Sequence, residues 1–261
     1  MPIINELEEL SLNAWPAHQS LLYSGWVLRF SGGYTSRANS INPLYDTGRA
    51  NKADLLAKIK ACEDLYTAKG FPTIFKLTPA SKPDELEETL AGSGYLKSDS
   101  VSVQILDLAD AERVNTLSGI ADPGGIRIVG DNELSPEWLE AWLELSRPEP
   151  RHRPQIEKLL SNILPERYFL RLERDGQVLA TGLAVCDRGY VGLFDIVTAP
   201  ASRQQGWGTR LVADLLNWGQ LRGAGTAYLQ VQTTNLAALR LYARLGFSEV
   251  YQYWYRIKQL P

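Results

Sequence analysis

A short loop between an apolar stretch and an amphipathic stretch has the residue types that bind a phosphate group. Two glycines, Gly206 and Gly208, precede a segment in which apolar residues recur with helical spacing. Glycine lets the backbone approach a ligand closely, and the first turn of a helix offers unpaired N–H groups and a positive dipole end to an anion. The sequence therefore predicts an anion site, which comprises Arg203, Gln204, Gln205, Gly206, Trp207, Gly208 and Thr209.

The elements around this loop are expected to build a mixed sheet covered by helices. Strands are predicted at 190–197 and 227–231, helices at about 208–221 and 236–245, and a last pair of extended segments between 247 and 257. Alternating strands and helices of this kind are typical of the α/β class. The anion loop would lie where a strand passes into a helix.

Local signals predict further elements upstream of the loop. Ser135-Pro136 is typical of a helix start, because serine caps the first turn and proline suits the first helical position. Asp175-Gly176 joins the predicted strands 168–174 and 177–185 as a hairpin. The first half is expected to contain helices at 5–14, 51–69 and 84–90, and strands or extended segments at 26–30, 34–41, 71–77 and 101–106.

The two halves share a faint repeat. The order strand, long helix, strand, short helix, glycine-aromatic pair and strand describes both 37–106 and 190–257. Gly94-Tyr95 of the first copy matches Gly246-Phe247 of the second. The first copy has no glycine pair before its long helix. If both halves have one fold, only the second is expected to hold a phosphate ligand.

A turn-forming run at 119–125 is the expected domain boundary, which divides the chain into domains 1–122 and 123–261. Within the first domain, the extended segment 34–41 and its neighbour Asn42 carry polar side chains. We interpret them as a solvated strand face, with a pocket wall as the alternative; they are Arg37, Asn39, Ser40 and Asn42.

Composition limits the classes of partner. The 261 residues carry a formal net charge of −3 and no basic tract, which argues against nucleic acid as a partner. No stretch approaches the ~18 apolar residues of a membrane span, so a cytoplasmic protein without a membrane partner is expected. Cys62 and Cys186 are interpreted as buried thiols. His18 and His152 have no partner at metal-ligand spacing, so no metal is expected.

The loop and the residues downstream of it together carry a family resemblance. Arg203-Gln-Gln-Gly-Trp-Gly208 resembles the R/Q-x-x-G-x-G/A loop of the GCN5-related N-acetyltransferase (GNAT) superfamily, and Asn235 with Tyr242-Ala-Arg-Leu-Gly-Phe247 resembles its N…Y-x-x-x-G-F ending. The match covers about residues 126 to 258. The segment from Gly25 to Leu44 is similar to the degenerate leading unit of two-domain members. The resemblance implies a tandem GNAT-like acyl-CoA N-acyltransferase fold.

The resemblance implies acetyl-CoA as the co-substrate. The pyrophosphate would bind the backbone N–H groups between Arg203 and Gly208. In the family, the strand before the loop splays from the next strand, and the pantetheine arm pairs with the exposed backbone. Ile196 and Val197 hold that position here, with 229–231 as the neighbouring strand. Asn235 matches a residue that commonly holds the arm of the cofactor.

The chemistry of acetyl transfer requires a base for the amine and an acid for the departing thiolate. Tyr242 matches the tyrosine of the family and is the predicted general acid. Asp195 is the predicted base, because many members carry an acidic residue just before the splayed segment. Glu173 and Asp187 are weaker candidates. Tyr242 and Asp195 also have structural alternatives to a catalytic role. Tyr242 would be a half-buried aromatic side chain of the helix, and Asp195 would cap a loop or pair with an arginine.

The expected function is acetyl transfer from acetyl-CoA to a small-molecule or amino-acid-like primary amine by direct transfer in a ternary complex. A peptide N-terminus remains an alternative acceptor, and a non-catalytic acyl-CoA-binding module is the alternative from another class. In the family, the first helix of the domain and the loop after it border the acceptor pocket, so Trp142, Arg151 and Arg153 are candidates for acceptor contacts. The oligomeric state is open, with a homodimer as one alternative.

Overall fold

The structure is a computed structural model that describes residues 3–45, 48, 51–109 and 125–260. The chain forms two compact units: unit 1 contains Met1–Ser102, Gln232–Thr234 and Tyr251–Pro261, and unit 2 contains Val103–Val231 and Asn235–Val250. The units are therefore not contiguous halves of the chain. The expected boundary run 119–125 lies outside the described residues except for Gly125.

Two strands account for this division. β6 (Val101–Asp107) begins in unit 1 and continues in unit 2, whereas β12 (Ser248–Lys258) begins in unit 2 and continues in unit 1. In unit 1, β12 pairs antiparallel with β4 (Thr73–Leu77). In unit 2, β6 lies beside β11 (Thr226–Gln232). Each unit thus completes its sheet with a strand from the other half of the sequence. The pair of extended segments expected at 247–257 is this single strand β12.

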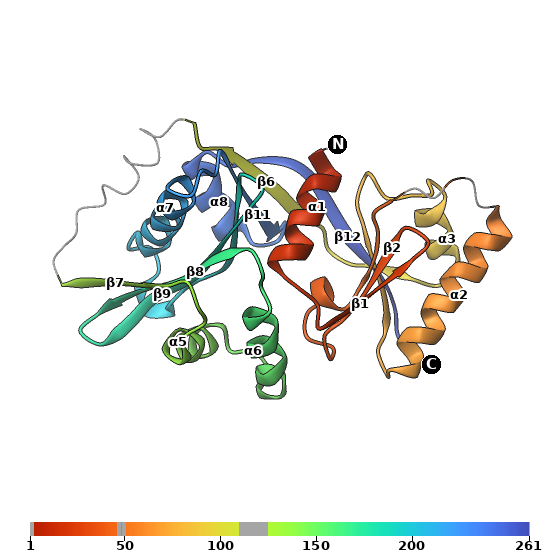
Figure 1. Ribbon diagram of the computed structural model, residues 1–261, viewed down its shortest axis with the longest axis horizontal. Coiled ribbons are helices and arrows are strands. Elements are labelled where there is room, and N and C mark those ends of the chain that lie inside the picture. The colour runs from red at the N-terminus through yellow and green to blue at the C-terminus, as the bar shows by residue number, and fades with distance from the viewer. Residues whose placement is uncertain (1–2, 46–47, 49–50, 110–124, 261) are drawn as a thin grey trace. The chain divides into compact units, whose positions relative to one another are not determined.

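Unit 1 is a sheet with helices on both faces (Figure 1). Across the sheet, its strands are β1 (Gln19–Tyr23), β2 (Trp26–Phe30), β3 (Ile41–Pro43), β4 and β12, with β5 (Leu96–Lys97) paired to β12. The β3–β4 ladder is parallel and the other described ladders of unit 1 are antiparallel. α2 (Lys52–Ala68) and α3 (Leu86–Gly92) pack on one face through a core that includes Trp26, Leu55 and Phe75.

A buried ion pair holds α1 (Ile3–Ala14) against the other face of this sheet. Successive side chains of a strand point to opposite faces, so Lys76 points away from Phe75 and Leu77 of the α2 core. Its Nζ lies 2.6 Å from Glu8 Oε2 of α1, and the Tyr251 hydroxyl donates to Glu8 Oε1 at 2.7 Å. Both charged side chains are buried. The ion pair therefore joins α1, β4 and β12.

The polar segment 34–41 is not the extended, solvated segment that we expected. Most of it is a turn with a short 3₁₀ helix, η1 (Ser36–Ala38). The Asn39 side chain organises the turn, because its Oδ1 accepts from two backbone N–H groups and its Nδ2 donates to two backbone carbonyls. Asn39, Ser40 and Asn42 are 4%, 0% and 1% exposed. The prediction of a solvated strand face was wrong, because these three polar side chains are buried inside unit 1.

Unit 2 is a mixed sheet, as expected. In order across the sheet its strands are β6, β11, β10 (Tyr190–Thr198), β9 (Gln177–Asp187), β8 (Glu166–Arg174) and β7 (Ile126–Asp131). The ladders from β7 to β10 are antiparallel, and the β10–β11 ladder is parallel. The predicted hairpin at Asp175-Gly176 is confirmed, with both residues in the left-handed region at φ 50° and 76°. This register brings the β8–β9 hairpin to the same end of the sheet as the last residues of β10.

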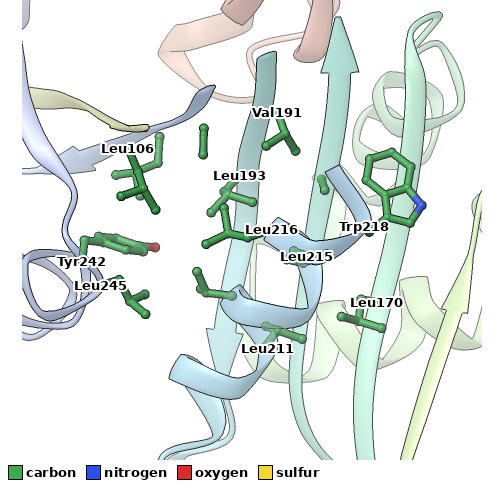
Figure 2. Close-up of a cluster of buried hydrophobic side chains, with 14 of the residues drawn as sticks. Leu106, Leu170, Val191, Leu193, Leu211, Leu215, Leu216, Trp218, Tyr242 and Leu245 are labelled. Atoms are coloured by element: carbon green, nitrogen blue, oxygen red, sulfur yellow. The ribbon is translucent and has the colours of Figure 1, made fainter. Parts of the chain in front are cut away.

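The core of unit 2 lies between the sheet and two helices, α7 (Trp207–Gln220) and α8 (Leu236–Leu245). Figure 2 shows Leu211, Leu215 and Leu216 of α7 against Leu170 and Leu193 of the sheet. The predicted helices at about 208–221 and 236–245 are therefore confirmed. Their apolar faces fix the start of α7 against the end of β10, which is where the anion loop lies.

The other face of the unit 2 sheet carries α5 (Pro136–Ser146), followed by η2 (Pro150–His152) and α6 (Arg153–Ser161). The predicted start of α5 is confirmed, because the Ser135 hydroxyl accepts from the Trp138 N–H at 3.2 Å. The Trp138 indole donates to the Leu170 carbonyl at 3.0 Å and packs against Phe169. Across the described residues, we find no helix with the length and hydropathy to cross a membrane.

Candidate functional site

Strands β10 and β11 separate part way along their length. Their parallel register runs from Tyr190 opposite Thr226 to Leu193 opposite Leu229, and no further pair follows in the described ladder. β10 continues for five residues beyond Leu193, to Thr198, while its other edge stays paired with β9. The separated stretch of β10 contains Asp195, Ile196 and Val197, whose side chains are half-buried. The three predicted strand residues therefore lie together at the separation.

A β-bulge lies within this stretch. The β9–β10 register shifts between Phe194 and Val197, and Asp195 has a φ of 51°. A bulge bends its strand and turns a side chain in a new direction. Ile196 packs on the α7 side, where a Cβ on Gly182 would lie 2.7 Å from Ile196 Cδ1. The absence of a side chain at Gly182 thus makes room for the bulged strand.

The anion loop passes from β10 through η3 (Pro200–Ser202) into α7. Gln204 and Gly206 have φ values of 60° and 90°, and Gly206 is the N-cap of α7. A glycine cap has no side chain to accept from the first turn, so the N–H groups at the start of α7 remain for a ligand. A Cβ on Gly208 would lie 3.1 Å from Leu241 and 3.2 Å from Thr198, so this glycine permits close packing of α7.

Side chains of the loop hydrogen-bond within the loop itself. Arg203 Nε donates to the Thr198 carbonyl at 3.4 Å, and Gln205 Nε2 donates to the Ala201 carbonyl at 3.0 Å. The Trp207 indole donates to Gln205 Oε1 at 3.2 Å. Trp207 is buried, whereas Arg203 and Gln205 are exposed. The loop therefore keeps a defined backbone and presents a cation at the surface.

The matching helix of the repeat, α2 in unit 1, begins differently. Its N-cap Asn51 accepts from the Asp54 N–H at 2.9 Å, and Asp54 in turn accepts from the Asn51 N–H in a capping box. A 540 Å³ cavity beside this helix start is lined in part by Glu85 and Glu88. Side-chain capping and nearby carboxylates both disfavour an anion. The start of α7 is therefore the better phosphate site of the two.

Tyr242 and Asn235 both come from α8. Asn235 is the exposed N-cap, and its Oδ1 accepts from the Ala238 N–H at 3.2 Å. Tyr242 is 7% exposed and belongs to the unit 2 core. In Figure 2 its hydroxyl oxygen points towards the side of the cluster that contains Leu193 and Leu216. Leu193 is the last residue of β10 that pairs with β11.

The two weaker base candidates are held in ion pairs. Glu173 accepts from Arg171 and lies 3.7 Å from Arg127, and Asp187 lies 3.7 Å from Arg188. Asp187 also pairs with Tyr190 at the opposite end of β10 from Asp195. Of the three carboxylates considered from the sequence, Asp195 is therefore the one at the strand separation.

The residues expected near the acceptor lie on the α5 side of the sheet. Trp142 is 5% exposed and stacks on Trp138 with ring centroids 6.4 Å apart. Arg151 pairs with Glu149 at 2.8 Å, and Arg153 donates to Glu140 at 3.0 Å. Both arginines are exposed and already paired with acids, so the structure gives them no distinct role in binding an acceptor. Among the described residues, no cluster of His, Cys, Asp and Glu has the arrangement of a metal site.

One further residue at this end of the sheet was missed from the sequence. The guanidinium of Arg174, the last residue of β8, lies 4.8 Å from the centroid of the Trp207 ring. The Asp175-Gly176 signal that follows it indicated only a turn. The register that brings the hairpin to the anion loop involves residues far apart in sequence, so no local pattern indicates this contact.

Several proteins that are similar in sequence to this chain are named as N-acetyltransferases. The Bacillus subtilis protein named uncharacterized N-acetyltransferase YobR is 29% identical over 259 residues, which are 99% of this chain and 100% of that protein. The Escherichia coli alanine N-acetyltransferase of ribosomal protein bS18 is 33% identical over 97 residues, 37% of this chain and 66% of its own length. The Serratia marcescens aminoglycoside N(6')-acetyltransferase type 1 is 30% identical over 127 residues, 42% of this chain and 86% of its own length.

Solved structures share the fold. A GCN5-related N-acetyltransferase from Kribbella flavida aligns with a TM-score of 0.74 at 16% identity, covering 100% of this chain and 97% of its own. A tandem GNAT protein from the clavulanic acid biosynthesis pathway aligns with a TM-score of 0.71 at 15% identity, covering 97% and 87%. The family model described as "Probable histone acetyltransferase Rv0428c C-terminal" matches residues 3–256. The chain belongs to this family and, with it, to the GNAT superfamily, as its sequence motifs predicted.

Proposed function

We propose that unit 2 is an acetyl-CoA-dependent N-acetyltransferase that acts on a primary amine in a ternary complex. The observation that carries this proposal is the end of the β10–β11 ladder at Leu193 and Leu229, directly before the bulge at Asp195. The pantetheine arm of CoA contains amide groups, which can pair with strand backbone as a neighbouring strand does. We assign this pairing to the backbone of Ile196 and Val197.

The phosphate end of the cofactor is assigned to the start of α7. The first N–H groups of the helix, on Trp207, Gly208 and Thr209, have no partner within the helix, and the helix dipole favours negative charge there. The exposed Arg203 adds a positive charge. Asn235 uses its Oδ1 to cap α8, which leaves its Nδ2 as the group to hold the arm.

The proposed chemistry is a single acyl transfer. The lone pair of the amine attacks the thioester carbonyl carbon, a C–N bond forms, and the C–S bond breaks as the tetrahedral intermediate collapses. Asp195 takes a proton from the amine, directly or through water, and the Tyr242 hydroxyl gives a proton to the departing thiolate. A backbone N–H on the separated part of β10 would stabilise the developing oxyanion.

For the acceptor, we propose a small or amino-acid-like amine. The relative from Serratia marcescens is named for an aminoglycoside, and a small polyfunctional amine of that kind fits this acceptor class. A peptide N-terminus is the second candidate, because the Escherichia coli relative is named for the alanine of a ribosomal protein. A net charge of −3 does not distinguish the two, since both acceptors present a cationic ammonium group at neutral pH.

The test measures free thiol released from acetyl-CoA in the presence of single amines. The panel contains free amino acids, an aminoglycoside, a diamine and a peptide with an N-terminal alanine. We expect amine-stimulated release with the native protein, and a fall of about a hundredfold or more with Tyr242→Phe, the size expected when a general acid is removed. The preferred amine of the panel assigns the acceptor class.

A binding measurement separates the enzyme from a non-catalytic acyl-CoA-binding protein. A ligand that binds only the folded state raises the melting temperature. A shift with acetyl-CoA but no amine-stimulated thiol release would contradict catalysis and support the binding protein. If neither a shift nor thiol release occurs, the assignment of acetyl-CoA itself is wrong.

A further inference from the structure

Arg174 and Trp207 form a stacked pair at the start of α7. The Arg174 guanidinium lies 4.8 Å from the centroid of the Trp207 ring. Trp207 is 5% exposed, and its indole N–H is fixed by Gln205. Arg174 ends β8, on the same side of the sheet as Leu172 of the α7 core. The pair therefore holds a planar cation beside the first turn of the helix.

Arg174 has no acidic partner within the described part of the chain. Among the residues that the structure describes, Arg174 forms no ion pair or hydrogen bond, and its Nε is buried without a partner. Three other arginines of unit 2 have acidic partners: Arg171 with Glu173, Arg210 with Asp214 at 3.0 Å, and Arg222 with Glu166 at 2.9 Å.

A half-buried charge without a hydrogen-bonding partner is unfavourable, which suggests that a ligand completes its surroundings. The cation–π contact with Trp207 offsets only part of this cost, since such contacts contribute about 0.5–2 kcal/mol.

We infer that Arg174 binds a phosphate group of acetyl-CoA, with Trp207 as the platform that positions it. The inference rests on the proposed function, because that function places the phosphates of the cofactor at the start of α7. A guanidinium stacked on an indole keeps the N–H donors at its edge free, and their fork geometry suits two phosphate oxygens. Arg174 and the N–H groups of α7 would then contact the phosphate-bearing end of the cofactor together.

The test compares three ligands: CoA, 3′-dephospho-CoA, which lacks only the 3′-phosphate, and pantetheine, which lacks every phosphate together with the adenosine. Calorimetric titration measures the affinity of native protein and Arg174→Gln for CoA, 3′-dephospho-CoA and pantetheine. We expect Arg174→Gln to weaken CoA binding about tenfold or more, as for a lost charge-assisted hydrogen bond, with pantetheine affinity unchanged. If Arg174→Gln loses affinity for CoA alone, Arg174 contacts the 3′-phosphate. If it loses the same affinity for 3′-dephospho-CoA, Arg174 contacts the pyrophosphate. Both results support the inference.

Arg222→Gln is the matched control. Arg222 also stacks on a tryptophan of α7, at 4.1 Å from the Trp218 ring, but it lies at the other end of the helix and is paired with Glu166. Its replacement should leave the affinity for all three ligands at the native value. An equal loss of CoA affinity in both variants would overturn the inference, because it would reflect a general effect on α7.

Other outcomes separate this inference from the proposed function. If the native protein binds CoA and Arg174→Gln binds it equally well, the inference is wrong and the proposed function stands. A loss that includes pantetheine would also overturn it, since pantetheine has no phosphate. If the native protein does not bind CoA, the proposed function fails first. If Arg174→Gln does not fold, Arg174→Lys is tested in its place. A CoA affinity at the native value in Arg174→Lys would show that the planar guanidinium of Arg174 is not needed for phosphate binding.

Discussion

The ring of Phe247 packs edge-on against the ring of Tyr242, with centroids 5.7 Å apart and planes at 67°. The Phe247 N–H also donates to the Tyr242 carbonyl at 3.0 Å. Between them, Gly246 ends α8 in the left-handed region at φ 95°. The glycine-phenylalanine pair thus ends the helix and holds the tyrosine ring in the core. Phe247 is a positioning residue for Tyr242 in this arrangement.

Replacing Phe247 should affect turnover more than cofactor binding. Phe247→Leu keeps an apolar side chain at a 6% exposed position but removes the edge-on contact with Tyr242. We expect a lower kcat with an unchanged KM for acetyl-CoA, measured by initial rates of thiol release. Phe247→Ala should also destabilise the protein by about 3–5 kcal/mol through the cavity it leaves. A native kcat in Phe247→Leu would show that the tyrosine does not depend on this contact.

Asp195→Asn should separate the charge of Asp195 from its backbone conformation. Asparagine adopts positive φ readily, so the φ of 51° and the bulge should be retained and the melting temperature should change little. Loss of the proposed base should lower the rate about 10²–10⁴-fold. Asp195→Gly relieves the positive φ and should be equally inactive with equal or higher stability. Native activity in Asp195→Asn would require another group to take the proton of the amine.

Breaking the buried ion pair of unit 1 should be costly. Lys76→Ala leaves Glu8 as an unpaired buried carboxylate, with an expected loss of about 3–5 kcal/mol in the free energy of unfolding. Replacing both, with Lys76→Met and Glu8→Leu, should recover most of this loss, although the Tyr251 hydroxyl then loses its acceptor. Urea unfolding of Lys76→Met, Glu8→Leu and the double variant measures the coupling. Additive single effects would contradict a direct interaction.

Acid should weaken the attachment of β12 to unit 1. Burial alone would raise the pKa of Glu87, but hydrogen bonds from Arg256 and Trp254 outweigh it and hold that pKa below its usual value of 4.5. A carboxyl with a lowered pKa in the folded state contributes stability above its unfolded pKa, and this stability is lost as the pH falls through the folded value.

The change to test is Glu87→Gln, with melting temperatures compared at pH 7 and pH 3. The native protein should lose more stability than this variant between the two pH values. Glu88→Gln is the control, because Glu88 is exposed on the same helix. If Glu87→Gln shows the same loss as the native protein, the ion pair with Arg256 does not contribute to acid sensitivity.

Helix starts and turns that depend only on neighbouring residues could be predicted from the sequence. Ser135-Pro136 starts α5 because capping needs only neighbouring residues, and Asp175-Gly176 turns the chain because both adopt positive φ. Gly206, the N-cap of α7, indicated the helix start for the same reason, with a φ of 90°. The family motif then identified Asn235 and Tyr242 on one helix, and the structure places both in the unit that contains Asp195. Their chemical roles remain predictions.

Features that depend on distant residues could not be predicted. β1 has five residues, four of them exposed, so it lacks the alternation that marks a strand. The segment 34–41 is expected to be extended because it lies between the turn at Gly32-Gly33 and the stop at Asn42-Pro43, but side-chain hydrogen bonds of Asn39 fold it into a turn. The contact of Arg174 with Trp207 depends on the register of three strands. None of these leaves a periodic pattern in the sequence.

The pairing of β4 with β12 has a consequence for biosynthesis. When residues 1–102 have been made, one edge of β4 still lacks its neighbour, because residues 251–258 are synthesised much later. At about 5–20 residues per second, this edge waits roughly 10–30 s for its partner strand. The sheet of unit 1 therefore has one open edge until residues 251–258 have been made, although most of its strands are synthesised long before.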